Sequence, residues 1–169
     1  MKKHRVLLSV LFVIPLAGRA ASPQISVQDQ RWLVATHQTN LSEIQSGHLA
    51  AQAGHSQTVR QAGQMLAADH QSLDAKLQPL ARQLGVELTA EPSAEQRDEM
   101  QHFKRLPGSD FDRTWAEQEA DGHVKSIDLT EREIRQGSSP QVKQLAQAAL
   151  PTLKKHLRTL RAISSPSGK

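Results

Sequence analysis

The segment Ser56–Leu84, with the sequence SQTVRQAGQMLAADHQSLDAKLQPLARQL, decides the fold class. Its apolar and small residues return every three or four positions, at Val59, Ala62, Leu66, Leu73, Leu77, Leu80 and Leu84, with His70 in the same series. This spacing is typical of the buried stripe of a long helix in a helical bundle. The segment therefore predicts a helix that packs against other helices along its whole length.

Three further segments carry a stripe of the same period, and we expect helices over residues 27–53, 111–136 and 140–163. The composition agrees, because only 3% of the residues are aromatic, whereas the strands of β-sandwiches and barrels favour aromatic and β-branched residues. Ala, Leu and Gln, which are good helix formers, are plentiful instead. The sequence thus predicts an all-α fold with four long helices.

Glycine, serine and proline mark the ends of these helices. Gly54 followed by Ser56 predicts a helix stop and a hydroxyl N-cap, and the segment Gly137–Pro140 repeats the device. Two helical hairpins result, joined by residues 85–108, a connection far longer than is usual in bundles. It should contain a short helix near residues 93–105, after which Ser109 or Asp110 caps the next long helix. Such a crossover starts the third long helix parallel to the second, which is the topology of ferritin-like four-helix bundles.

The N-terminus has the three-part layout of a secretory signal peptide. A basic start, Lys2 to Arg5, precedes an apolar stretch from Val6 to Ala17, and Gly18 and Ala20 suit cleavage after residue 20. The apolar stretch is shorter than the ~20 residues that span a bilayer, although an uncleaved anchor is the alternative. We expect a signal peptide at 1–20, a linker at 21–28, the bundle at 29–163 and a flexible tail at 164–169, in a periplasmic or secreted protein without a transmembrane segment after cleavage.

Composition and charge exclude several classes of protein. The absence of cysteine excludes disulfides, thiol catalysis and a lipoprotein anchor. Four of the 21 basic residues and none of the 17 acidic residues lie in the predicted signal peptide. The mature chain is therefore neutral, and no nucleic acid partner is indicated. Neither a Gly-x-Ser-x-Gly elbow nor a nucleotide-binding glycine pattern occurs, so the sequence predicts no catalytic residue and gives no reason to expect an enzyme.

Three histidines fall on the stripes that should face the core: His70, His123 and His156. Counted from the hairpin turns at 1.5 Å per residue, all three and Glu43 lie near the middle of the bundle. Three imidazoles and a carboxylate suit one borderline transition-metal ion, either Fe, Mn, Cu or Zn. The three histidines and Glu43 would be the ligands, and Asp69 would orient one imidazole ring.

The alternative is a polar layer without a metal, in which each buried ring finds hydrogen-bond partners. The other histidines of the mature chain, His37, His48, His55 and His102, are predicted to face solvent, and Trp32, Trp115 and Phe111 to anchor the core. Ferritin-like di-iron sites use a Glu-x-x-His motif on each of two helices, whereas this chain contains only one such motif, Glu99–His102, in the long connection. With Glu43 as the single inward glutamate, we expect one metal ion and not a carboxylate-bridged pair.

Several short motifs resemble those of a known family: Asn40–Ile44, Met65–His70, Leu106–Asp112, His123 and Ala149–Leu157. Together they resemble the ferritin-like family catalogued as domain of unknown function 4142 (DUF4142), over nearly the whole mature chain. The resemblance implies an exported bacterial protein with a ferritin-like bundle and no established activity. This sequence departs from the family at Trp115, where third helices often carry tyrosine shortly after Phe-Asp.

Two functions from different classes follow. The first is an exported metal-binding bundle used in metal handling or stress defence. The second is a metal-free structural or interaction module of the cell envelope that acts through a protein partner. The sequence fixes neither the metal nor the oligomeric state.

Overall fold

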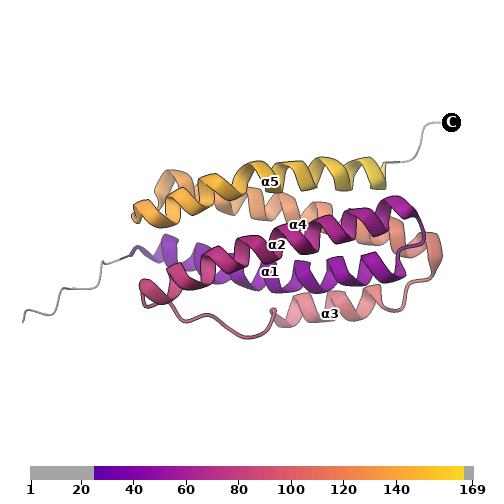
Figure 1. The fold of residues 1–169 in the computed structure, drawn as a ribbon, viewed down its shortest axis with the longest axis horizontal. Helices are drawn as coiled ribbons and strands as arrows, with labels where there is room; N and C mark the ends of the chain where they lie inside the picture. The colour runs from indigo at the N-terminus through magenta and orange to yellow at the C-terminus, as the bar shows by residue number, and fades with distance from the viewer. Residues whose placement is uncertain (1–24, 166–169) are drawn as a thin grey trace, which may run out of the picture.

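Five α-helices form the part of the chain that the computed structural model describes, residues 25–165 (Figure 1). They are α1 (Val27–Ala53), α2 (Gln57–Gln83), α3 (Ala94–Phe103), α4 (Gly108–Gln136) and α5 (Pro140–Ser164). The predicted all-α class and the short helix in the connector are confirmed. The signal peptide expected at 1–20, the first part of the linker and residues 166–169 of the tail lie outside the described residues. No described helix combines the length and apolar character that a bilayer crossing requires.

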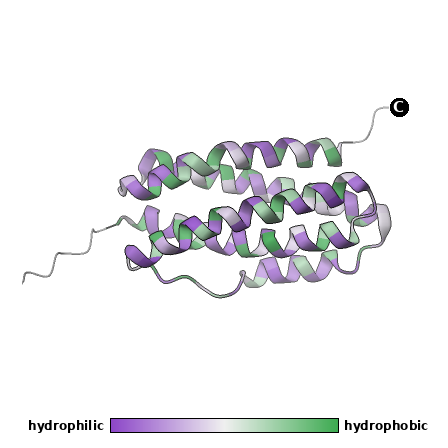
Figure 2. Ribbon diagram, viewed as in Figure 1, coloured by the Kyte–Doolittle hydropathy of each residue, from purple (hydrophilic) through white to green (hydrophobic). Residues whose placement is uncertain are grey.

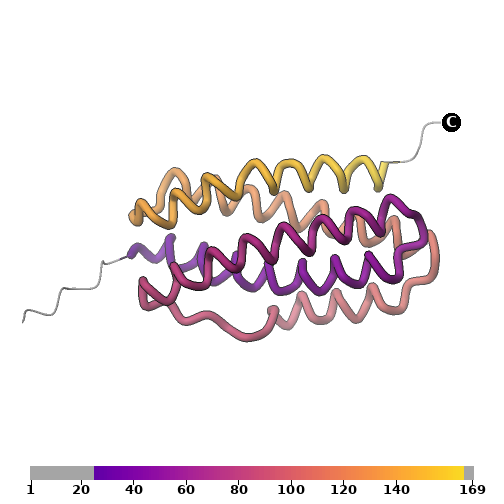
Figure 3. Tube along the Cα trace, in the orientation of Figure 1, coloured from indigo at the N-terminus to yellow at the C-terminus, as the bar shows by residue number. Residues whose placement is uncertain are grey.

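The long helices form two antiparallel hairpins, α1 with α2 and α4 with α5, and the connector returns along the bundle between them (Figure 3). Contacts at both ends fix this arrangement. The backbone N–H groups of His55 and Ser56 donate to Asp112 at the start of α4, over 2.8 and 2.7 Å. At the other end, the backbone N–H of Ser138 donates to Asp29 over 3.0 Å. Therefore α4 runs antiparallel to α1 and parallel to α2, as the crossover predicted.

The predicted N-caps are confirmed at the two tight turns, but the cap predicted for α4 is wrong. Ser56 accepts from the Val59 N–H over 3.2 Å, and Ser139 caps α5 in the same way. In contrast, α4 begins at Gly108, with Pro107 in the cap position and no side-chain cap. Gly108 adopts a φ of +47°, which lets the chain enter the helix before Ser109 and Asp110. The Pro107 carbonyl accepts from the Asp110 and Phe111 N–H groups, so neither predicted residue is needed as a cap.

Helices α1 and α2 approach closely at two glycines, Gly47 and Gly63. A Cβ atom on Gly63 would lie 2.5 Å from the Gly47 carbonyl oxygen, and one on Gly47 would lie 2.6 Å from the Gly63 carbonyl oxygen. Only glycine leaves room for backbones this close. The contact fixes the height of α2 against α1 and hence the relative positions of the polar side chains that the two helices carry.

The hydrophobic core is divided into two clusters by a polar layer at mid-height. One cluster, near the α1–α2 turn, contains Phe111, Trp115 and Leu66, and the other, at the opposite end, contains Trp32, Leu33 and Leu77. Figure 2 shows hydrophobic and hydrophilic positions alternating along all four long helices. Trp32, Trp115 and Phe111 are at most 1% exposed, so their prediction as core anchors is confirmed.

Candidate metal centre

The three histidines predicted to face inward meet in the polar layer. His70 comes from α2, His123 from α4 and His156 from α5, and each is at most 2% exposed. Their ring centroids are 5.2 to 5.5 Å apart. One ring nitrogen of each lies within 4.8 Å of the others. Three helices of the bundle therefore contribute one imidazole each to a single buried point.

Each imidazole uses its outer nitrogen to donate to a group that only accepts. The Nδ1 of His70 lies 3.0 Å from the Asn40 amide oxygen, whose own amide nitrogen donates to Asp74. The Nδ1 of His123 lies 2.8 Å from the Glu119 carbonyl oxygen, and the Nε2 of His156 lies 2.9 Å from Asp69 Oδ2. These acceptors fix the proton of each neutral ring on its outer nitrogen.

The inner nitrogens consequently carry lone pairs that point at one another. His123 Nε2 and His156 Nδ1 are 3.2 Å apart, and His70 Nε2 has no hydrogen-bond partner. Two facing lone pairs repel unless a proton or a cation lies between them. Burial lowers the pKa of all three rings, so an extra proton is unfavourable near neutral pH. Metal-ligating histidines show this same arrangement, with the outer N–H held by a carboxylate or a carbonyl.

Glu43 on α1 places a carboxylate beside the three histidines, next to His70 Nε2 and, through Oε1, 3.4 Å from the outer nitrogen Nδ1 of His123. Glu43 Oε2 lies 3.9 Å from His70 Nε2, and neither of these buried atoms has a hydrogen-bond partner. That distance is too long for a hydrogen bond, but it is close to the roughly 3.4 Å that separates two ligand atoms bound to one ion at about 2.1 Å in a tetrahedral site. Burial raises the pKa of Glu43 to about 8, and a cation beside the carboxylate would lower it.

Glu119 on α4 is a second inward carboxylate, which the sequence analysis missed. Three atoms lie within 4.8 Å of one another here: a carboxylate oxygen of Glu43, a carboxylate oxygen of Glu119 and a ring nitrogen of His123. The Ser46 hydroxyl donates to Glu119, and the Trp115 indole N–H donates to Ser46 over 2.8 Å. Burial, together with the charge of Glu43, raises the pKa of Glu119 well above its ordinary value. The expectation of a single inward glutamate is therefore wrong.

The position of Glu119 in the sequence indicates that its side chain faces the core. The residue lies three positions after Ala116 and four before His123, both on the predicted inner stripe of that helix. On this helix the predicted inner stripe contains only apolar residues and His123. In a layer that already contained imidazoles, a carboxylate at the same helical spacing belonged to the same face.

His37 corrects a second expectation, because it is 5% exposed and does not face solvent. Its Nδ1 lies 2.7 Å from Asp74 and its Nε2 lies 2.8 Å from the Thr89 carbonyl oxygen in the connector. Asp74 also accepts from Asn40, which holds His70. His37 therefore ties the crossover to the hydrogen bonds that orient a candidate ligand. The connector covers this side of the helix, which the sequence pattern does not reveal.

Asp69 is the only one of the five predicted site residues that reaches solvent, with a side chain 37% exposed. It borders a groove of about 110 Å³ between α2 and α5. It lies behind His156 and holds that ring. The structure thus brings His70, His123 and His156 to one point, places Glu43 beside them in a second group with Glu119 and His123, and leaves Asp69 as a supporting acceptor.

Comparison with known proteins identifies a family and a fold. A family model described as "Domain of unknown function (DUF4142)" matches residues 15–163. A crystal structure of a DUF305 fragment from Deinococcus radiodurans superposes with a TM-score of 0.70 at 15% identity, covering 84% of this chain and 98% of that chain. At that identity the similarity shows the fold alone. No curated protein matches the chain.

Proposed function

This chain belongs to the DUF4142 family, and we propose that it is an exported helical bundle that binds a transition-metal ion in its mid-bundle polar layer. The ligands are His70, His123, His156 and Glu43, with Asp69 orienting His156. Glu119 adds a further carboxylate on the side of Glu43. Imidazole and carboxylate together suit Fe, Mn, Cu or Zn.

One observation carries the proposal. The three outer ring nitrogens are all engaged with acceptors, so the inner nitrogens are free to bind an ion. A metal-free polar layer would pair its buried atoms, because an unpaired buried polar group costs about 1–3 kcal/mol. Here Glu43 Oε2 and His70 Nε2 stay unpaired while facing each other. A cation at that point satisfies both.

Metal content tests the proposal directly. The protein is stripped with a chelator, exposed to each of the four metals, passed through a desalting column and measured by elemental analysis. We expect one ion per chain in the wild type and almost none in the double variant His70→Ala/His156→Ala. His48→Ala, which removes an exposed histidine of α1, is the matched control and should load fully. A ligand that binds the native state should also raise the melting temperature.

Two results would overturn the proposal: no uptake of any of the four metals by the wild type, or equal metal content in the wild type and the double variant. Either would favour a metal-free module of the cell envelope. Circular dichroism checks that the double variant folds. If it does not, Glu43→Gln, which keeps the shape of the side chain, replaces it, and that variant should lower the affinity for the metal.

We propose export on the basis of the N-terminal sequence, with a role in metal handling or stress defence outside the cytoplasm. The full chain is expressed in a Gram-negative host, and the periplasmic fraction is analysed by N-terminal sequencing. We expect the mature protein to begin at Ala21. Retention of the unprocessed chain in the cytoplasm would contradict export without affecting the metal centre.

A further inference from the structure

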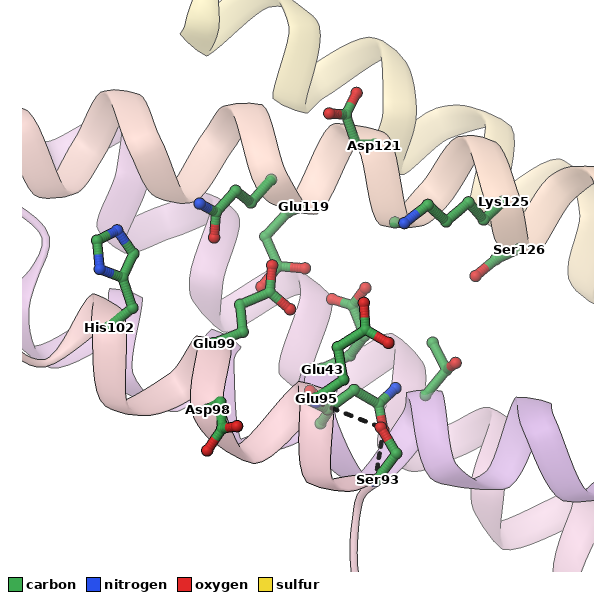
Figure 4. A pocket seen from close by; sticks show the side chains of 15 residues that line it. Glu43, Ser93, Glu95, Asp98, Glu99, His102, Glu119, Asp121, Lys125 and Ser126 are labelled. Atoms are coloured by element: carbon green, nitrogen blue, oxygen red, sulfur yellow. Dashed lines mark hydrogen bonds between the residues drawn. The ribbon is translucent and has the colours of Figure 1, made fainter.

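A cleft of about 580 Å³ leads from the surface toward the metal centre. It lies where the short helix α3 covers α1 and α4, and side chains of all three helices line it (Figure 4). The groove between α2 and α5, which His70 and His156 line, is much smaller, at about 110 Å³. The cleft is the larger of these two routes to the buried layer.

Carboxyl groups line much of the cleft. Six acidic side chains line it: Glu43, Glu95, Asp98, Glu99, Glu119 and Asp121. The basic side chain of Lys125 is their single lysine or arginine counterpart there. In Figure 4, Glu99 from α3 and Glu119 from α4 point toward the middle of the cleft, whereas Asp98 and Asp121 point away from it. Negative charge in a cleft with walls of low dielectric constant concentrates cations.

Glu43 connects the cleft to the histidines. The side chain of Glu43 lines the cleft but is only 6% exposed, so it forms part of the inner wall. Its unpartnered Oε2 lies 3.9 Å from the unpartnered Nε2 of His70. One buried carboxylate therefore faces the acidic cleft and the imidazole layer. An ion that reaches Glu43 from the cleft has only to exchange water for a ring nitrogen.

We propose that this cleft is a cation-binding entrance, through which hydrated divalent transition-metal ions reach the metal centre. Glu95 and Glu99 attract the hydrated ion, and Glu43 and Glu119 bind it as it loses water and moves to His70, His123 and His156. This inference rests on the proposed function and names the route to that site. The smaller groove reaches His70 and His156 directly, but its one carboxylate, Asp69, is engaged with His156, so we place entry at the cleft with six acidic side chains.

Gly122 offers a way to close the cleft without disturbing its walls. It lines the cleft on α4, and a Cβ atom built on it meets nothing within 4 Å. Gly122→Phe should therefore fill the cleft with an aromatic ring. Gly122→Ala is the control for the loss of glycine. Ala148→Phe is the control for a phenylalanine, because Ala148 is exposed and borders the groove between α2 and α5.

The measurement is the rate of Co²⁺ uptake by metal-free protein, followed by stopped-flow absorbance, together with the amount of Co²⁺ bound at equilibrium. We expect Gly122→Phe to slow uptake and chelator-driven release several-fold while the bound amount stays the same. Gly122→Ala and Ala148→Phe should match the wild type. Uptake that is unchanged in Gly122→Phe, or slowed in Ala148→Phe instead, would overturn the inference and leave the proposed function intact.

A second variant tests the charge and does not depend on packing. In Glu95→Gln/Glu99→Gln, uptake of Co²⁺ at low ionic strength should slow by about tenfold, and its dependence on salt should weaken. Glu87→Gln/Glu91→Gln removes the same charge from exposed connector positions outside the cleft and should have little effect. Equal slowing in both pairs would overturn the route. A wild type that takes up neither Co²⁺ nor any of Fe, Mn, Cu and Zn would overturn the proposed function and the entrance together.

Discussion

Replacing Glu43 by glutamine should change how the stability of the metal-free protein depends on pH. Glu43 is buried and lacks a positive partner, so burial raises its pKa from 4.5 to about 8 in the folded chain. Between those two values the folded state holds a proton that the unfolded state has released. The free energy of unfolding therefore falls as pH rises through this window. Glutamine cannot ionise, so Glu43→Gln should remove this loss of stability.

The size of the effect follows from the pKa shift. Between the unfolded and folded pKa values, each pH unit costs about 1.4 kcal/mol. From pH 5.5 to 7.5 the contribution of Glu43 is thus about 2.7 kcal/mol. Lowered pKa values of the three histidines act in the opposite direction below pH 6.5, and Glu133 and Glu119 act in the same direction as Glu43. The difference between wild type and variant cancels the contribution of Glu133, whereas that of Glu119 changes with the substitution, because Glu43 helps to raise the pKa of Glu119.

The assay is urea unfolding followed by circular dichroism, with chelator present, at pH 5.5 and 7.5. We expect the stability of Glu43→Gln relative to the wild type to rise by about 2–3 kcal/mol between the two pH values. Glu117→Gln, on the exposed face of α4, is the control and should show no such change. If the difference between Glu43→Gln and the wild type is the same at both pH values, the reasoning about the unpaired carboxylate is refuted.

Three further predictions concern the metal and the packing. Metal affinity should rise by about tenfold per pH unit between pH 6 and 8, because the ion displaces the proton of Glu43; isothermal titration of Glu43→Gln should show a much weaker dependence. Gly63→Ala should destabilise the protein by about 1–3 kcal/mol, because its Cβ would lie 2.5 Å from the Gly47 carbonyl oxygen. Gly122→Ala, whose Cβ would have no atom within 4 Å, should instead stabilise the protein by up to about 1 kcal/mol. Urea unfolding measures both changes, and the opposite ranking of the two variants would contradict the packing. Burial would raise the pKa of Asp29, but hydrogen bonds from Ser138, Ser26 and Ser139 hold it well below its usual range. Asp29→Ala should therefore lower the free energy of unfolding by about 2–3 kcal/mol above pH 4. This difference from the wild type disappears as the pH falls and the wild-type carboxylate is protonated.

The sequence predicted those features that depend on regular helical spacing. Every helix has a fixed rise per residue, so counting from the turns at Gly54 and Gly137 was enough to place His70, His123 and His156 at one height. The caps at Ser56 and Ser139 were equally predictable, because each side chain bonds to its own helix. Local chemistry and periodicity together gave the two hairpins and the crossover.

The remaining features depend on contacts between segments that lie far apart in the sequence. Asn40 holds His70 only because α1 and α2 pack at the height set by Gly47 and Gly63. His37 is buried because Thr89 of the connector folds over it. The acidic cleft exists only once α3 has docked on α1 and α4. Periodicity identifies the inner face of one helix, but it does not say which partner meets each polar side chain.

Clamps at the two ends of the bundle explain how four helices can hold ligands at one point. Asp112 binds the backbone of the α1–α2 turn at one end, and Asp29 binds that of the α4–α5 turn at the other. Each clamp joins one hairpin to the other, so the hairpins cannot slide along the bundle axis without breaking charge-assisted hydrogen bonds. A slide of one helical turn would move a ligand by about 5.4 Å, more than the 4.8 Å that encloses the three ring nitrogens. The clamps therefore preorganise the polar layer before any ion binds. The unfavourable free energy of placing unpaired polar groups side by side lowers the stability of the fold and does not weaken the binding of the ion.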